Sequence, residues 1–102
     1  MYTVLAHELA AKELEELPDR LRGQMFRLIE RLETEGRLKM PHSKVIGGGL
    51  FELRVGGADI ARTLYCYEKD QKIYLLHAFV KKTQTTPARA INLARQRLGD
   101  FE

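Results

Sequence analysis

Residues 50–80 read LFELRVGGADIARTLYCYEKDQKIYLLHAFV, three runs of strand-forming residues separated by two short polar turns. In the first run, residues 50–55, apolar side chains alternate with Glu52 and Arg54, which is typical of a strand with one buried face. The other two runs are Ile60–Tyr67 and Ile73–Val80. The third run is almost wholly apolar, so we expect it to be central in the sheet. Turns this short favour an antiparallel meander.

Two helices are predicted before this region. Residues 7–16 are rich in Ala, Leu, Glu and Lys, which are good helix formers. After the break at Pro18, apolar residues recur at helical spacing from Leu21 to Leu32, with Asp19 as the expected N-cap and Gly36 as the stop. The opposite face of this second helix carries Arg and Glu side chains, which we interpret as a solvated face with intrahelical ion pairs; its arginines are Arg20, Arg22, Arg27 and Arg31.

A third helix is predicted after the sheet. Thr86 is expected to cap it, with Pro87 in its first position and Gly99 at its end. Its expected buried stripe is Ile91, Ala94 and Leu98.

The order of these segments indicates an α+β fold. Two N-terminal helices precede an antiparallel sheet of three to four strands and one C-terminal helix, and we expect the helices on one face of the sheet. The fourth strand would be a short one near Lys44–Ile46, ahead of a turn at Gly47-Gly48-Gly49. With 102 residues, the chain is predicted to form a single domain over residues 1–102.

Several functional classes are not supported by the residues. Cys66 is the only cysteine, which excludes an intrachain disulfide or a cysteine zinc cluster. Ser43 is the only serine and lacks the Gly-x-Ser-x-Gly turn of many hydrolases, and no phosphate-binding glycine motif is present. The three histidines do not form a His-x-x-x-His pair, so we expect no metal and no cofactor. Without a signal peptide or an apolar run of about 20 residues, we expect a cytoplasmic protein with no membrane partner.

Charge is unevenly distributed along the chain. Residues 36–97 contain twelve Lys and Arg against four Asp and Glu, a balance of +8. Residues 1–35 contain five against eight, a balance of −3. Such a basic block indicates a surface that meets polyanions, although a solvated mixed surface would have the same composition.

Cationic side chains occur on each of the three predicted strands. Arg54 and Arg62 lie on the first two, and Lys81 and Lys82 follow the third. A meander would let these side chains converge on one face, where arginine and lysine bind a phosphodiester and stabilise its transition state. The alternative is structural: Arg54 could pair with a carboxylate on a neighbouring strand, Asp59 or Glu68, and Arg62 could belong to a buried ion pair.

His77 and Tyr65 are the candidates for proton transfer beside these cations. Histidine titrates near neutral pH, as a general base requires, whereas tyrosine would need neighbours that lower its pKa strongly. Both also have packing interpretations. His77 stands among Leu75, Leu76 and Phe79, as a buried histidine would, and Tyr65 suits a half-buried face.

Three segments resemble a known family: Gly49–Arg54, Arg62-Thr63-Leu64-Tyr65 and Leu75–Pro87. They are similar to the HigB-type, phage-protein-like branch of the RelE/ParE toxin superfamily. The most specific part is HAFVKKTQTTP, residues 77–87, and the resemblance covers about residues 17–100.

This resemblance implies a compact RelE-like toxin with an abbreviated opening strand over Tyr2–Leu5. It implies a metal-independent, ribosome-dependent endoribonuclease that cleaves mRNA in the ribosomal A site. It also implies a cognate helix-turn-helix antitoxin, with operator DNA bound only through the antitoxin complex.

The resemblance also implies roles for individual residues. The family's strand arginines fall on Arg54 and Arg62, and its C-terminal basic position falls on Lys82 with Lys81 beside it. Its basic approach for RNA falls near Lys39 and Lys44. Two differences stand out: lysine positions of the first catalytic strand hold Leu50 and Glu52, and the last helix has no tyrosine. Tyr65 or His77 would substitute, or the cations would act alone.

Two other functions remain open on the sequence. The chain could be a non-catalytic, ParE-like inhibitor or binding module that acts on a protein target through its basic surface. It could also be a general phosphate-backbone binder, whose affinity would fall steeply with salt.

Overall fold

The computed structural model describes residues 1–56, 60–81 and 85–101. Its elements in chain order are β1 (Thr3–Ala6), α1 (Glu8–Glu15), α2 (Asp19–Glu35), β2 (Ser43–Gly47), β3 (Leu50–Gly56), β4 (Ile60–Glu68), β5 (Lys72–Lys81) and α3 (Ala88–Gly99). The predicted α+β class and the order of helices and later strands are confirmed. No helix in these ranges is long and apolar enough to cross a membrane.

The sheet has five strands in the order β1-β5-β4-β3-β2. Strands β2 to β5 form the predicted antiparallel meander, whereas β1 pairs with β5 in parallel. The sheet is therefore mixed and larger than the predicted three to four antiparallel strands. Strand β1 has four mostly exposed residues and pairs with a strand some seventy residues away, so no local pattern in the sequence predicts it. Strand β4 is in the middle, and β5 lies beside it.

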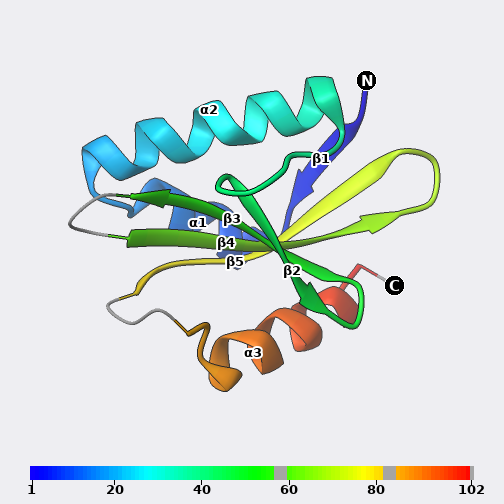
Figure 1. Ribbon diagram of the computed structural model, residues 1–102. Coiled ribbons are helices and arrows are strands. Elements are labelled where there is room, and N and C mark those ends of the chain that lie inside the picture. Colours follow the sequence, from blue (N-terminus) through cyan, green and yellow to red (C-terminus); the bar gives the residue numbers. More distant parts are fainter. Residues whose placement is uncertain (57–59, 82–84, 102) are drawn as a thin grey trace.

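Helices cover both faces of the sheet, which corrects the expectation of one covered face (Figure 1). On one face, α1 and α2 pack on a core that includes Leu53, Tyr65 and Leu75. On the other, α3 packs on a second core that includes Leu64 and Leu76. Both faces need a cover because β4 and β5 carry apolar side chains on each side.

The helix termini differ from the predicted caps at two places. The N-caps are Pro18 and Pro87, one residue from the expected Asp19 and Thr86. The Thr86 hydroxyl donates a hydrogen bond to Glu52 instead of capping α3. Gly36 ends α2 as predicted, with a positive φ of 79° that favours glycine.

The buried stripe of α3 is shifted relative to the prediction. Ala94 is buried as expected, but Ala90 and Arg97 are its buried companions, while Ile91 and Leu98 are only half-buried. The helix therefore buries the charged side chain of Arg97. Its ion-pair partner is Glu13 of α1.

Candidate functional site

A buried carboxylate is the centre of the candidate site. Glu52 of β3 is 1% exposed and lies opposite Leu64, so it faces the α3 side of the sheet. Its Oε1 is 3.3 Å from Arg62 Nε and 3.7 Å from Arg54 Nε. Its Oε2 accepts the hydrogen bond from Thr86. Glu52 and Arg54, the polar positions of the first predicted strand, therefore lie beside Arg62 of the second strand. The alternation in residues 50–55 indicated that Glu52 and Arg54 share a face.

Lys81 joins this group from β5. The register aligns Arg54 with Arg62 and Ile60 with Lys81, which brings three cations to adjoining strands. We refer to Glu52, Arg54, Arg62 and Lys81 as the cation cluster. Its single carboxylate leaves an excess of two positive charges among these four side chains.

Burial and mutual repulsion lower the pKa values of Lys81 and Arg62 in the cation cluster. Lys81 is 6% exposed, and burial lowers its pKa, as do Arg62 and Arg54, while Glu52 opposes the change. Burial also lowers the pKa of Arg62. Buried cations in excess of their counterions are costly, and such sites are typical of function. An anion in this place would offset the repulsion.

Of the three lysines expected to bind RNA, Lys81 belongs to the cation cluster, and Lys44 and Lys39 are exposed. Lys44 of β2 pairs in register with Glu52 and contributes to the lowered pKa of Lys81. Lys39 lies in the connection between α2 and β2, where its carbonyl accepts hydrogen bonds from the backbone of His42 and Ser43. Lys82 lies outside the described residues.

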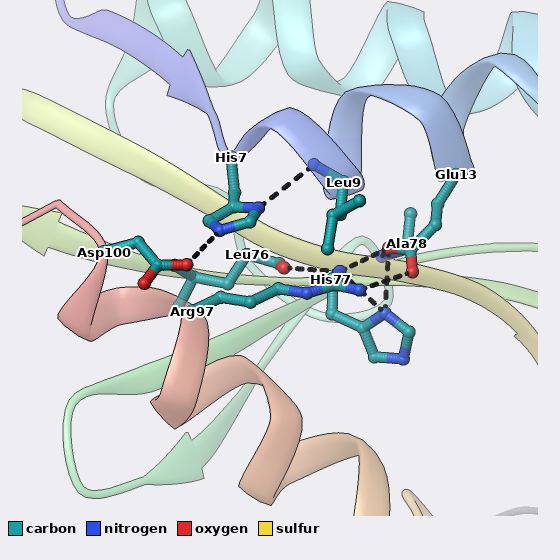
Figure 2. Close-up of polar contacts among 8 residues, drawn as sticks. All are labelled: His7, Leu9, Glu13, Leu76, His77, Ala78, Arg97 and Asp100. Atoms are coloured by element: carbon teal, nitrogen blue, oxygen red, sulfur yellow. Dashed lines mark hydrogen bonds and ion pairs between the residues drawn. The ribbon is translucent and has the colours of Figure 1, made fainter.

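His77 is engaged in a separate polar junction (Figure 2). Its Nδ1 is 2.9 Å from Glu13 Oε1, which also accepts from Arg97 Nη1 at 2.7 Å and from the Ala78 backbone at 3.1 Å. The junction ties α1, β5 and α3 together, and the His77 ring stacks on Phe79 at 4.7 Å. These contacts favour the packing interpretation of His77 over proton transfer at the cation cluster.

Tyr65 lies on the opposite face of the sheet. It is 1% exposed, its hydroxyl is 2.6 Å from Ser43 Oγ, and its ring stacks on Phe51. Burial raises the pKa of Tyr65, which is the wrong direction for a base. The structure does not bring Tyr65 to the cation cluster.

Sequence reasoning missed a second group of polar side chains, which includes two arginines. Arg27, Arg31 and His42 line a cavity of about 620 Å³ together with Arg54 and Arg62. The available signal is the spacing of Gln24, Arg27 and Arg31 on one stripe of α2; from sequence, the two arginines are assigned to a solvated face. The predicted solvated face with intrahelical ion pairs is observed as well, since Arg27 and Arg31 are exposed, Arg22 pairs with Asp19 at 3.0 Å, and Arg31 pairs with Glu35 at 2.9 Å.

Comparison with solved structures identifies the fold. The toxin–antitoxin complex RelBE2 of Mycobacterium tuberculosis matches with a TM-score of 0.60 and 22% identity, covering 78% of this chain and 98% of that chain. A mutant of the Escherichia coli toxin RelE in the free state matches with a TM-score of 0.70 and 17% identity, covering 95% and 97%. The fold is therefore RelE-like. No curated protein matches the sequence.

The sequence also matches the model of a protein family. The model of the family described as phage derived protein Gp49-like (DUF891) matches residues 12–99, which is most of the chain. The resemblance to the phage-protein-like branch is thereby confirmed, and the chain belongs to the phage-derived Gp49-like family.

Proposed function

We propose that this chain is the toxin of a toxin–antitoxin pair and a metal-independent endoribonuclease that cleaves mRNA in the ribosomal A site. The observation that carries the proposal is the cation cluster, in which buried Arg62, buried Lys81 and half-buried Arg54 share one buried carboxylate. Such an arrangement suits a phosphodiester, whose charge increases in the transition state. The RelE-like fold supports the same function, because the two similar structures described above contain RelE-type toxins.

In the proposed reaction, the 2′-hydroxyl of a ribose attacks the adjacent phosphorus. The bond from phosphorus to the 5′-oxygen breaks, which yields a 2′,3′-cyclic phosphate and a 5′-hydroxyl. Arg62 and Lys82 would hold the scissile phosphate, and Arg54 would position the backbone. Guanidinium groups suit these roles because they bind two phosphate oxygens at once.

Proton transfer is assigned to Lys81 in this proposal. The 2′-hydroxyl must lose a proton, and the 5′-oxygen must gain one. A lysine serves as a base only when its pKa is lowered towards the working pH, and burial beside Arg62 and Arg54 lowers that of Lys81. Of the candidates from sequence, His77 contacts Glu13 through Nδ1, and the Tyr65 hydroxyl contacts Ser43 on the opposite face of the sheet.

The partners follow from the same proposal. We expect a cognate helix-turn-helix antitoxin, operator DNA bound only through that complex, and mRNA presented by the ribosome in the cytoplasm. Lys44 and Lys39 would guide the RNA towards the cation cluster. The positive charges of Lys44 and Lys39 suit this role, because phosphate contacts supply most of the affinity for nucleic acid.

Primer extension on a reporter mRNA in a cell-free translation reaction tests the proposal. We expect cuts at defined codon positions only when ribosomes translate. Arg62→Ala should reduce the cleavage rate by about 30- to 1,000-fold, because losing one phosphate-stabilising cation costs about 2–4 kcal/mol. Arg20→Ala, at an exposed position of α2, is the matched control. Intact mRNA with normal protein output would instead favour a non-catalytic inhibitor of a protein target.

A further inference from the structure

A cavity of about 620 Å³ opens between α2 and the end of the sheet where β3 stops and β4 begins. Its volume is within the range of small-ligand sites, about 300–1,000 Å³. The described residues that line it include no carboxylate. Its polar lining is Gln24, Arg27, Arg31, His42, Arg54 and Arg62. We call this cavity the α2 pocket.

Some arginines of α2 pair with a carboxylate of the same helix, as Arg22 does with Asp19 at 3.0 Å. Arg27 and Arg31 are four residues apart, where like charges destabilise a helix. Arg31 is offset by Glu35, whose Oε2 is 2.9 Å from its Nε. Within the described part of the chain, Arg27 makes no ion pair. An anionic ligand would supply the missing counterion.

Gln24 adds a second requirement for the ligand. Its side-chain oxygen is buried and makes no hydrogen bond within the described residues, although the residue lines the pocket. An unpaired buried acceptor is costly, so a ligand that donates a hydrogen bond there gains affinity. The ligand should therefore combine an anion with a hydroxyl or amino donor.

We propose that the α2 pocket binds a nucleotide of the RNA next to the scissile phosphate, with Arg27 and Arg31 on its phosphate and Gln24 accepting from its hydroxyl or amino group. This inference rests on the proposed function, because Arg54 and Arg62 line the pocket and also belong to the cation cluster. A chain with a phosphate at every nucleotide can occupy both places at once. An acidic peptide would have to reach Gln24 with a backbone N–H, because its ionised carboxylates only accept hydrogen bonds, whereas a nucleotide carries hydroxyl and amino donors beside its phosphate.

Fluorescence anisotropy with a labelled RNA tetranucleotide tests the inference on the purified full-length chain. Arg27→Gln should weaken binding about tenfold, as expected for the loss of a charge-assisted hydrogen bond. It should also reduce the slope of log affinity against log salt by about one. Arg20→Gln, exposed on the same helix but outside the pocket, should change neither quantity. Both variants should keep the wild-type melting temperature, because both side chains are exposed.

Two results would overturn the inference. One is an equal effect of Arg27→Gln and Arg20→Gln, which would mean that only the general field of the helix matters. The other is tighter binding of a glutamate-rich peptide than of RNA at the same salt, with Arg27→Gln weakening only the peptide.

Failure of the proposed function would look different. Wild-type protein would leave mRNA intact in the translation reaction, while Arg27→Gln would still weaken RNA binding. Conversely, suppose that cleavage depends on Arg62 but RNA binding does not depend on Arg27. This result would support the proposed function and contradict nucleotide binding in the α2 pocket.

Discussion

Glu52 gives the candidate site its unusual electrostatics. A carboxylate that is 1% exposed must be paired, and here it has Arg54, Arg62 and the hydroxyl of Thr86 as partners. It organises the cations without neutralising them all. We interpret Glu52 as a positioning residue that holds two guanidinium groups in place for an anion.

At Lys81, proton transfer and simple charge can be separated by substitution. Lys81→Arg keeps the positive charge, but arginine does not deprotonate in proteins, so we expect cleavage to fall by about 100-fold or more. His77→Gln should cleave at nearly the wild-type rate, because His77 is engaged with Glu13. Single-turnover primer extension measures both variants. Near-normal cleavage by Lys81→Arg would reduce the role of Lys81 to phosphate binding.

At the scale of elements, the junction around Glu13 joins three segments that are distant in the chain. Its carboxylate binds Arg97 of α3 through both oxygens, at 2.7 and 3.0 Å, and His77 of β5 at 2.9 Å (Figure 2). Nearby, His7 Nε2 is 2.6 Å from Asp100. The junction closes the edge of β5 beyond the end of β1, where backbone groups would otherwise be unpaired.

Replacing Glu13 should loosen this junction. Glu13→Gln is expected to lower the free energy of unfolding by about 1–3 kcal/mol at pH 7, since Arg97 would lose its charged partner. Urea denaturation measures the change, with Glu15→Gln at an exposed site of the same helix as control.

The effect of Glu13 should also depend on pH. Burial opposes its ionisation, but hydrogen bonds from Arg97 and His77 outweigh burial and lower its pKa below the ordinary 4.5. A depressed folded pKa stabilises the protein above the unfolded value, and this contribution is lost as pH falls through the folded value. The difference in stability between the wild type and Glu13→Gln should therefore begin to shrink below about pH 4.5 and vanish once the pH is below the lowered folded pKa. A difference that persists unchanged in strong acid would contradict the ion-pair account.

At the scale of the whole molecule, the fold concentrates positive charge at one end of the sheet. The cation cluster and the α2 pocket share Arg54 and Arg62, so one end of the sheet carries both. The opposing acidic groups lie mainly on the N-terminal helices. A free protein with this distribution stores electrostatic repulsion that a bound anion relieves.

Inorganic phosphate should therefore stabilise the free protein. At constant ionic strength, replacing chloride by phosphate is expected to raise the Tm by a few degrees, because a ligand that binds only the folded state stabilises it. Arg62→Ala should lose most of this shift, whereas Arg20→Ala should keep it. Differential scanning calorimetry measures the wild type and both variants in each salt, and an equal shift in both variants would indicate a general salt effect.

Local patterns account for much of this molecule. The alternation in residues 50–55 predicted that Glu52 and Arg54 share a face, and helical spacing with Gly36 predicted the extent of α2. The proximity of Arg54 and Arg62 also followed from a short hairpin, because neighbouring strands leave little choice of register. All of these depend on residues that are close in sequence.

Only the tertiary structure decided the remaining features. Three features depend on contacts between segments that are far apart in the sequence. They are the parallel pairing of β1, the covering of both faces of the sheet and the burial of Glu52. The same is true of the engagement of His77 with Glu13 and of the α2 pocket, where a helix and two strands contribute side chains. Periodicity specifies which way a side chain points from its own helix or strand. Its partners depend on how the helices and strands pack together, and no local sequence pattern contains that arrangement.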